Sequence, residues 1–155
     1  MKKFVVVLIL IFSMFIAGCR VNNTDDTTDG EETGMTGNNK LNIQVGNTTL
    51  TATLTDNSSA DALKELLEKE PLTIDMSDYN NMEKVGSIGT DLPRNDEQIS
   101  TGPGDLILYQ GNSFVIYYST NSWSLTRLGK IDGVTDKELK EILGDGDVTV
   151  TLSLV

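Results

Sequence analysis

The sequence contains no histidine and only one cysteine, and both features limit the chemistry that the chain can perform. Without histidine, Ser-His-Asp catalysis, Cys-His catalysis and histidine-ligated zinc sites are excluded. Histidine is also the side chain best suited to proton transfer near neutral pH. A single cysteine cannot form an intrachain disulfide, so a folded domain must be stabilised by its core. We therefore expect no catalytic residue, no metal site and no cofactor.

Basic residues are scarce relative to acidic ones. The chain has 12 Lys and Arg residues against 23 Asp and Glu residues, which gives a formal net charge of −11. An acidic surface is repelled by nucleic acid and by anionic lipid, and it keeps a protein soluble. We therefore expect a monomer without a nucleic-acid partner, whose charge could attract cationic ligands.

Only the N-terminus carries a long apolar run. Two lysines begin the chain, apolar residues follow over positions 4–16 with one serine among them, and Ala17 and Gly18 then precede Cys19. This order is typical of a secretory signal peptide. The run of about 13 residues is too short to span a bilayer, which requires roughly 20. The pattern predicts a signal peptide over residues 1–18.

The tetrad Ile16-Ala17-Gly18-Cys19 resembles the bacterial lipobox, with Ile16 where leucine is usual. The resemblance implies cleavage before Cys19 and acyl chains such as palmitate on this cysteine. Two or three acyl chains anchor a protein firmly, because each buried methylene contributes about 0.8 kcal/mol. We therefore expect a lipoprotein whose membrane partner is reached through Cys19, on the extracytoplasmic face of the cell membrane. The alternative is an uncleaved anchor with an incidental cysteine.

Residues 20–40 consist mostly of Asn, Thr, Asp, Glu and Gly, and Val21 and Met35 are their only apolar side chains. Such a segment cannot bury enough apolar surface to offset the entropy lost on ordering. The composition predicts a lipidated cysteine followed by a disordered acidic tether over residues 19–40. One folded domain is expected over residues 41–155.

The domain is predicted to be mostly β. Alternating or continuous apolar runs predict strands. These runs lie at 41–45, 48–55, 72–76, 106–109, 114–118, 124–131 and 148–154. Helical spacing predicts one short helix between the capping candidates at 56–59 and Pro71, and a capping box at Thr135 opens a second. About seven strands and two short helices favour a closed β-barrel, and residues 79–93 are expected to be irregular.

Five segments carry a family resemblance when they are taken together in this order. They lie at 52–60, 79–86, 92–93, 102–109 and 128–131, and they include Asn-Met-Glu-Lys at 81–84 and Pro-Gly-Asp at 103–105. Together they resemble a bacterial cyclophilin-like family of uncharacterised proteins, over roughly residues 41–155. The resemblance implies a cyclophilin-like closed β-barrel, in agreement with the strand pattern.

The resemblance does not bring a catalytic residue with it. Cyclophilins that isomerise X-Pro bonds use an arginine beside a proline pocket lined by Phe and Met, with Trp and His nearby. This chain lacks histidine and the Phe-His-Arg and Phe-Met-Gln-Gly-Gly-Asp signatures, and only Gly104-Asp105 remains of them. Asp105 itself fits a turn residue that caps backbone amides.

The best candidates for a ligand groove are side chains outside the predicted core pattern. They are Tyr79, Glu83, Arg94, Tyr117, Trp123 and Arg127. Tyr79 and Glu83 fall in the irregular segment, where functional side chains tend to lie. The two arginines could hold a ligand carboxylate or carbonyl. Trp123, the only tryptophan, lies in a polar stretch after a buried-looking strand and offers apolar area with few rotatable bonds.

Each candidate also has a structural alternative. Residues 79–93 could be a plain loop, with Met82 and Val85 packed inward and Glu83 and Lys84 solvated. The arginines could form surface ion pairs, and Trp123 could close one end of the barrel. We therefore hypothesise an envelope-tethered binding module for an unknown small ligand or peptide. The rival functions are a weak peptidyl-prolyl isomerase that assists envelope protein folding and a structural surface lipoprotein.

Overall fold

The computed structural model describes residues 39–155. The predicted signal peptide, Cys19 and the predicted tether up to residue 38 lie outside the described residues. The strands are β1 (Lys40–Val45), β2 (Thr48–Leu54), β3 (Leu72–Tyr79), β4 (Glu83–Ser87), β5 (Glu97–Thr101), β6 (Asp105–Tyr109), β7 (Ser113–Tyr117), β8 (Asn121–Ile131) and β9 (Val148–Leu154). The helices are α1 (Ser58–Leu67) and α2 (Asp136–Leu143). No helix within these residues is long and apolar enough to cross a membrane.

Eight of the strands close into an antiparallel barrel. Their order is β2-β1-β9-β3-β4-β7-β6-β8, and the pairing of β8 with β2 joins the two ends of the sheet. Closure leaves no free edge in the barrel, so the backbone groups of its strands are paired. The prediction of a mostly β, closed barrel with two short helices is confirmed.

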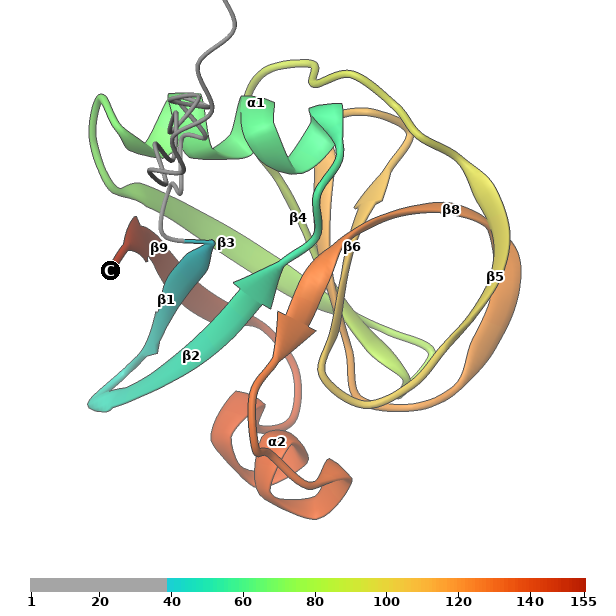
Figure 1. The fold of residues 1–155 in the computed structure, drawn as a ribbon. Helices are drawn as coiled ribbons and strands as arrows, with labels where there is room; N and C mark the ends of the chain where they lie inside the picture. The colour runs from blue at the N-terminus through green and yellow to red at the C-terminus, as the bar shows by residue number, and fades with distance from the viewer. Residues whose placement is uncertain (1–38) are drawn as a thin grey trace, which may run out of the picture. The chain divides into compact units, whose positions relative to one another are not determined.

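The barrel interior holds the main hydrophobic core, and the two helices close its ends (Figure 1). Inward residues alternate along the strands, as in Leu41 and Ile43 of β1, which are fully buried. Helix α1 is capped by Asn57, whose side chain accepts a hydrogen bond from the backbone N–H of Ala60. Helix α2 has the predicted capping box between Thr135 and Glu138. Both helices bury their leucines in the same core cluster.

The expectation that residues 79–93 are irregular is wrong for the part that forms β4. Asn80 and Asn81 both have a φ of 52°, and the N–H of Met82 donates to the carbonyl of Tyr79 at 3.1 Å. This is the geometry of a tight turn that suits the right-handed twist of a hairpin, and asparagine tolerates it. The turn sends β4 back along β3. The strand was not predicted because β4 contains charged residues and a glycine and therefore lacks apolar alternation.

Strand β5 was also not expected, so the described residues hold nine strands rather than about seven. The first strand begins at Lys40, one residue before the predicted domain boundary. The sequence of β5, Glu-Gln-Ile-Ser-Thr, has one apolar side chain, and most of the strand is exposed. A strand that is held by one neighbour on the outside of a barrel needs no apolar face, and this explains why hydrophobic periodicity missed it.

Lys84 of β4 is the most unusual residue of the interior, because its side chain is fully buried. Its Nζ atom donates to Asp78 Oδ2 at 2.8 Å and to the carbonyls of Gly144 and Gly146 at 2.8 and 2.6 Å. The Tyr118 hydroxyl donates to the same Asp78 oxygen at 2.5 Å. All three ammonium donors are therefore used, and they fasten β4 to the loop after α2. The alternative in which Lys84 is solvated is wrong.

The Lys84–Asp78 pair predicts a defined loss of stability in acid. The hydrogen bond from Lys84, followed by that from Tyr118, lowers the pKa of Asp78 below its ordinary value. A carboxyl group whose pKa is lowered by folding stabilises the protein fully above its unfolded pKa of about 4. This contribution is lost as the pH falls through the folded pKa. In urea unfolding from pH 7 to pH 2, the gap in stability between wild type and Asp78→Asn should narrow as the pH falls. A constant gap would contradict the assignment.

The seam between β2 and β8 depends on Gly129. A Cβ atom at this position would collide with the carbonyl oxygen of Thr53 and lie 3.0 Å from the Cα atom of Leu54. Gly129→Ala should therefore push the two strands apart and lower the free energy of unfolding by about 2 kcal/mol. Gly102→Ala is the matched control, since nothing lies within 4 Å of its added Cβ. Urea titration measures both variants, and equal stability of the two would rule out a tight seam.

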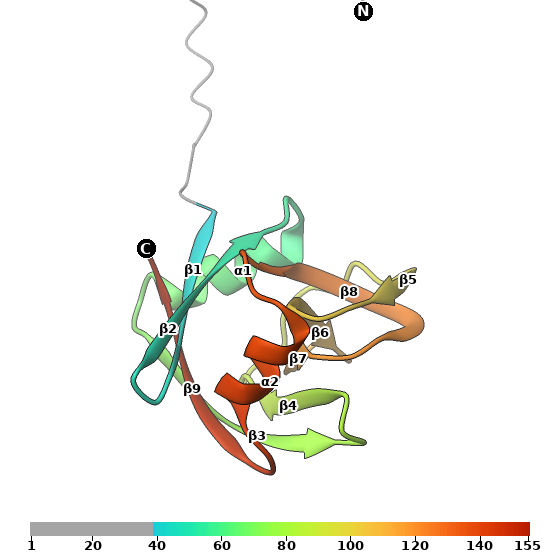
Figure 2. The ribbon, with the colours of Figure 1, turned by 90° about the horizontal axis from the view of Figure 1, so that it is seen from below.

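A bulge in β8 directs the first half of this strand away from the barrel. The register between β6 and β8 shifts between Leu106 and Ile107, where Leu106 pairs with Gly129 but Ile107 pairs with Arg127. Bulges bend a strand and re-aim it. Beyond the bulge the first half of β8 pairs with β5 outside the barrel. Figure 2 shows these two strands projecting from the barrel as a ribbon.

A candidate ligand groove on the outer face of the barrel

The outer face of β4, β7 and β6 is unusually apolar. In β7, Phe114 and Ile116 face the barrel core, while Val115 and Tyr117 face outward and are nevertheless buried. They pack with Ile107 of β6 and Leu125 of β8 in a second, smaller hydrophobic cluster. The ribbon of β5 and β8 covers this cluster from one side. A hydrophobic surface outside the barrel is thus formed by one sheet face and one projecting ribbon.

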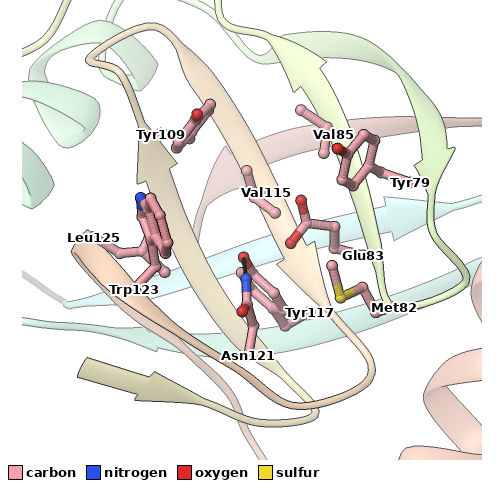
Figure 3. A pocket seen from close by; sticks show the side chains of 10 residues that line it. All are labelled: Tyr79, Met82, Glu83, Val85, Tyr109, Val115, Tyr117, Asn121, Trp123 and Leu125. Atoms are coloured by element: carbon pink, nitrogen blue, oxygen red, sulfur yellow. Dashed lines mark hydrogen bonds between the residues drawn. The ribbon is translucent and has the colours of Figure 1, made fainter. Parts of the chain in front are cut away.

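A groove of about 330 Å³ lies beside this second cluster (Figure 3). Its walls come from β3, the turn after it, β4, β6, β7 and β8. The lining residues are Tyr79, Met82, Glu83, Val85, Tyr109, Val115, Tyr117, Asn121, Trp123 and Leu125. The volume is within the range of small-molecule sites, as is the pattern of an apolar lining with a few polar groups.

The rim of the groove is aromatic. Trp123 is 62% exposed, Tyr79 is 56% exposed and Tyr109 is 39% exposed. These are the exposed aromatic residues of the part of the chain that the structure describes, and all three line this groove. Aromatic side chains offer a large apolar area and lose little entropy on binding. Trp123 does not close a barrel end, and it lies in β8 rather than in a loop.

Glu83 supplies a buried acidic group at the base of the groove. The residue is only 9% exposed, and its Oε2 atom is buried without a hydrogen-bond partner. Burial raises the pKa of Glu83, and the neighbouring Tyr117 hydroxyl offsets part of that rise. The two residues face each other across β4 and β7 in the strand register. The alternative in which Glu83 is solvated is therefore wrong.

Tyr117 is held in place as a neutral phenol. Asn121 Nδ2 donates to the Tyr117 hydroxyl at 3.1 Å. Burial, together with the adjacent Glu83, raises the pKa of Tyr117 far above the physiological range. The hydroxyl proton therefore stays on Tyr117 and is directed to the Glu83 carboxyl group, so this pair offers a ligand the acceptor of Glu83 Oε2. Within residues 39–155, no three Asp, Glu, Cys or His side chains come close enough together to hold a metal ion.

The structure brings together four of the six groove residues that the sequence suggested, namely Tyr79, Glu83, Tyr117 and Trp123. The two arginines lie elsewhere. Arg94, in the loop before β5, pairs with Asp96. Arg127 pairs with the buried Asp105, and its Nη2 atom donates to the Ser100 carbonyl at 3.2 Å.

Arg94 therefore matches the surface ion pair considered as its alternative, whereas Arg127 pairs with a carboxyl group that is buried. Asp105 also accepts a hydrogen bond from the N–H of Gly102 at 2.8 Å, as expected for a turn residue. Its carboxyl group thus serves both the turn and Arg127.

Sequence reasoning missed six groove residues. They are Met82, Val85, Tyr109, Val115, Asn121 and Leu125. Strand alternation gave a signal for one of them, because Val115 shares a face with Tyr117. The Asn80-Asn81 pair was a second signal, since it is a hairpin turn that places Glu83 and Val85 on one face of β4. No local sequence pattern indicated that residues of β8 would line the groove.

Comparisons with known proteins agree on the fold. A family model described as the cyclophilin-like family matches residues 43–153. The structure also resembles the solution structure of a hypothetical protein from the archaeon Archaeoglobus fulgidus, with a TM-score of 0.54 and 12% sequence identity. That similarity covers 75% of this chain and 94% of the archaeal chain, and at this identity it concerns the fold alone. A search of the curated proteins finds no match.

Proposed function

The chain belongs to the cyclophilin-like family, and from this premise we propose that it is a membrane-anchored extracytoplasmic binding protein whose outer groove captures a small ligand or a peptide. Family and fold alone do not specify an activity, because function resides in particular sites on a fold. The proposal therefore rests on the groove and on the N-terminal sequence.

One observation carries the binding role. The exposed aromatic side chains within residues 39–155 gather at a single groove instead of being scattered over the surface. Exposing several aromatic rings to water is unfavourable, and clustered apolar patches on a soluble domain mark interaction sites. Buried Val115 and Leu125 form the floor between the rings, so a bound ligand would cover apolar surface on several sides.

The anchoring role rests on the N-terminal sequence. The lipobox at residues 16–19 favours acyl chains on Cys19, and the acidic composition of residues 20–38 favours a spacer between the lipid and the barrel. A tethered domain searches only the volume near the membrane, so its binding partner would be met at the cell surface.

No observation favours the isomerase or the purely structural alternative over binding. Isomerases of related fold place an arginine in the proline pocket, but Arg94 and Arg127 are both engaged in ion pairs away from this groove. A structural surface protein would have no need for an open groove with exposed aromatic residues.

Trp123→Ala tests the proposed function. Because Trp123 is largely exposed, we expect its truncation to change the free energy of unfolding by less than about 1 kcal/mol. Capture of hits from a panel of short peptides and small organic compounds should fall at least five-fold. Ligand-observed NMR measures capture by the full-length chain in a non-ionic detergent.

Val155→Ala is the control, since Val155 is exposed but does not line the groove. This variant should retain capture. Hits that bind wild type and Trp123→Ala equally well, or a panel without a hit, would contradict a binding groove at this position.

A further inference from the structure

The buried carboxyl group of Glu83 is the feature of the groove that a purely apolar ligand would not explain. A buried polar atom without a partner is costly, and such atoms are rare in folded proteins. Glu83 Oε2 is such an atom, and it lies in the wall of an open groove. The side chain is too deeply buried to be solvated freely, yet Glu83 lines a groove that a ligand could enter (Figure 3).

The surroundings of Glu83 supply no positive charge. The ten groove residues include no lysine or arginine. Lys84, the next residue in β4, points into the barrel, and its three N–H donors form hydrogen bonds with Asp78, Gly144 and Gly146. Tyr117 is the polar side chain nearest to the carboxyl, and it is neutral. The negative charge of Glu83 therefore lacks a counter-ion within the described residues.

The rings around the groove complement this charge. Tyr79, Tyr109 and Trp123 present aromatic rings at the rim, and Tyr117 presents one at the base (Figure 3). Aromatic faces carry partial negative charge and attract cations. The described domain is also acidic overall, which raises the local concentration of cations. An anionic ligand would meet an uncompensated carboxylate and would be repelled by it.

We propose that the groove recognises an alkylammonium group, held by a hydrogen-bonded ion pair with Glu83 Oε2 and surrounded by the aromatic rings of Tyr79, Tyr109, Tyr117 and Trp123. This inference rests on the proposed binding function and specifies the chemical class of the ligand. The group has at least one N–H, because the unpartnered Oε2 atom requires a donor. A free alkylamine and a lysine side chain share this chemistry.

The test uses the fluorescence of Trp123, the only tryptophan of the chain, in the full-length protein in a non-ionic detergent. The probes are n-butylammonium, Nα-acetyl-lysine amide, tetramethylammonium and butan-1-ol, each titrated at constant ionic strength. We expect a saturable change with at least one of the two primary ammonium probes. Its dissociation constant should be at least ten-fold lower than that of butan-1-ol, which lacks the charge, and that of tetramethylammonium, which lacks the N–H.

Glu83→Gln keeps the shape of the side chain and removes its charge, so it should weaken ammonium binding at least ten-fold. Glu65→Gln is the matched control, because it makes the same chemical change at an exposed position of α1. This control should bind as wild type does. If both variants lose affinity equally, the attraction comes from the overall acidic charge and the proposal is wrong.

The remaining outcomes separate this inference from the binding function itself. Preference for n-butylammonium over Nα-acetyl-lysine amide indicates a free amine as the source, and the reverse indicates a peptide; either supports the proposal. Equal affinity for butan-1-ol or tetramethylammonium overturns it, as does the absence of saturable ammonium binding. If neutral compounds still bind in a manner that depends on Trp123, only the ammonium inference fails. If no compound binds at all, the proposed function fails with it.

Discussion

Replacing Lys84 with methionine should lower the free energy of unfolding by about 3–5 kcal/mol, which is a large part of the stability of a domain of this size. Methionine has a similar volume, so the loss would not come from a cavity. The loss would come from the groups that now accept hydrogen bonds from the Lys84 ammonium. Asp78 would lose its counter-ion, and the carbonyls of Gly144 and Gly146 would lose their donor inside the protein.

Urea unfolding at pH 7 measures this effect. Lys137→Met is the matched control, because Lys137 is highly exposed on α2 and reaches only Glu141, at 3.9 Å. Its stability should stay within about 0.5 kcal/mol of wild type. The double variant Lys84→Met with Asp78→Asn should recover part of the loss, since the unpaired charge is removed with its partner. A stable Lys84→Met protein without such coupling would show that the buried lysine is not paired.

Replacing Cys19 with serine should abolish both the lipidation and the normal processing of the N-terminus. The lipobox ends at this residue, and serine has no thiol on which a thioether-linked acyl group can form. Firm anchoring depends on the acyl chains, because each buried methylene contributes about 0.8 kcal/mol. Wild-type protein in cells fed labelled palmitate should carry the label and appear in its processed form, whereas Cys19→Ser should carry no label and stay unprocessed.

The control for this experiment is Ser13→Ala, a substitution within the apolar run that leaves the lipobox intact. It should be labelled and processed as wild type is. Palmitate that is still incorporated into Cys19→Ser would show that lipid is attached elsewhere, and unlabelled wild type would leave the alternative of an uncleaved anchor.

The sequence by itself determined the features that depend on neighbouring residues. The N-caps of both helices and the capping box of α2 could be predicted, because Asn57 and Thr135 bond to groups within three residues. The hairpin of β1 and β2 and the final strand followed from alternation along single segments. These predicted elements indicated a closed barrel, because many short strands without a covering layer of helices have few other ways to bury one face. Signal cleavage and lipidation remain predictions from residues 1–19.

Tertiary structure alone decided which polar residues are buried. Lys84 and Glu83 are adjacent and both charged, so a local pattern places both in water. The strand directs Lys84 to Asp78 and two distant carbonyls, and it directs Glu83 outward into a groove whose far wall is β8. These partners lie up to 62 residues away along the chain. A charged side chain can be buried only where the fold places such partners beside it. Strand pairing over long sequence separation decides where these partners lie, and local preferences do not.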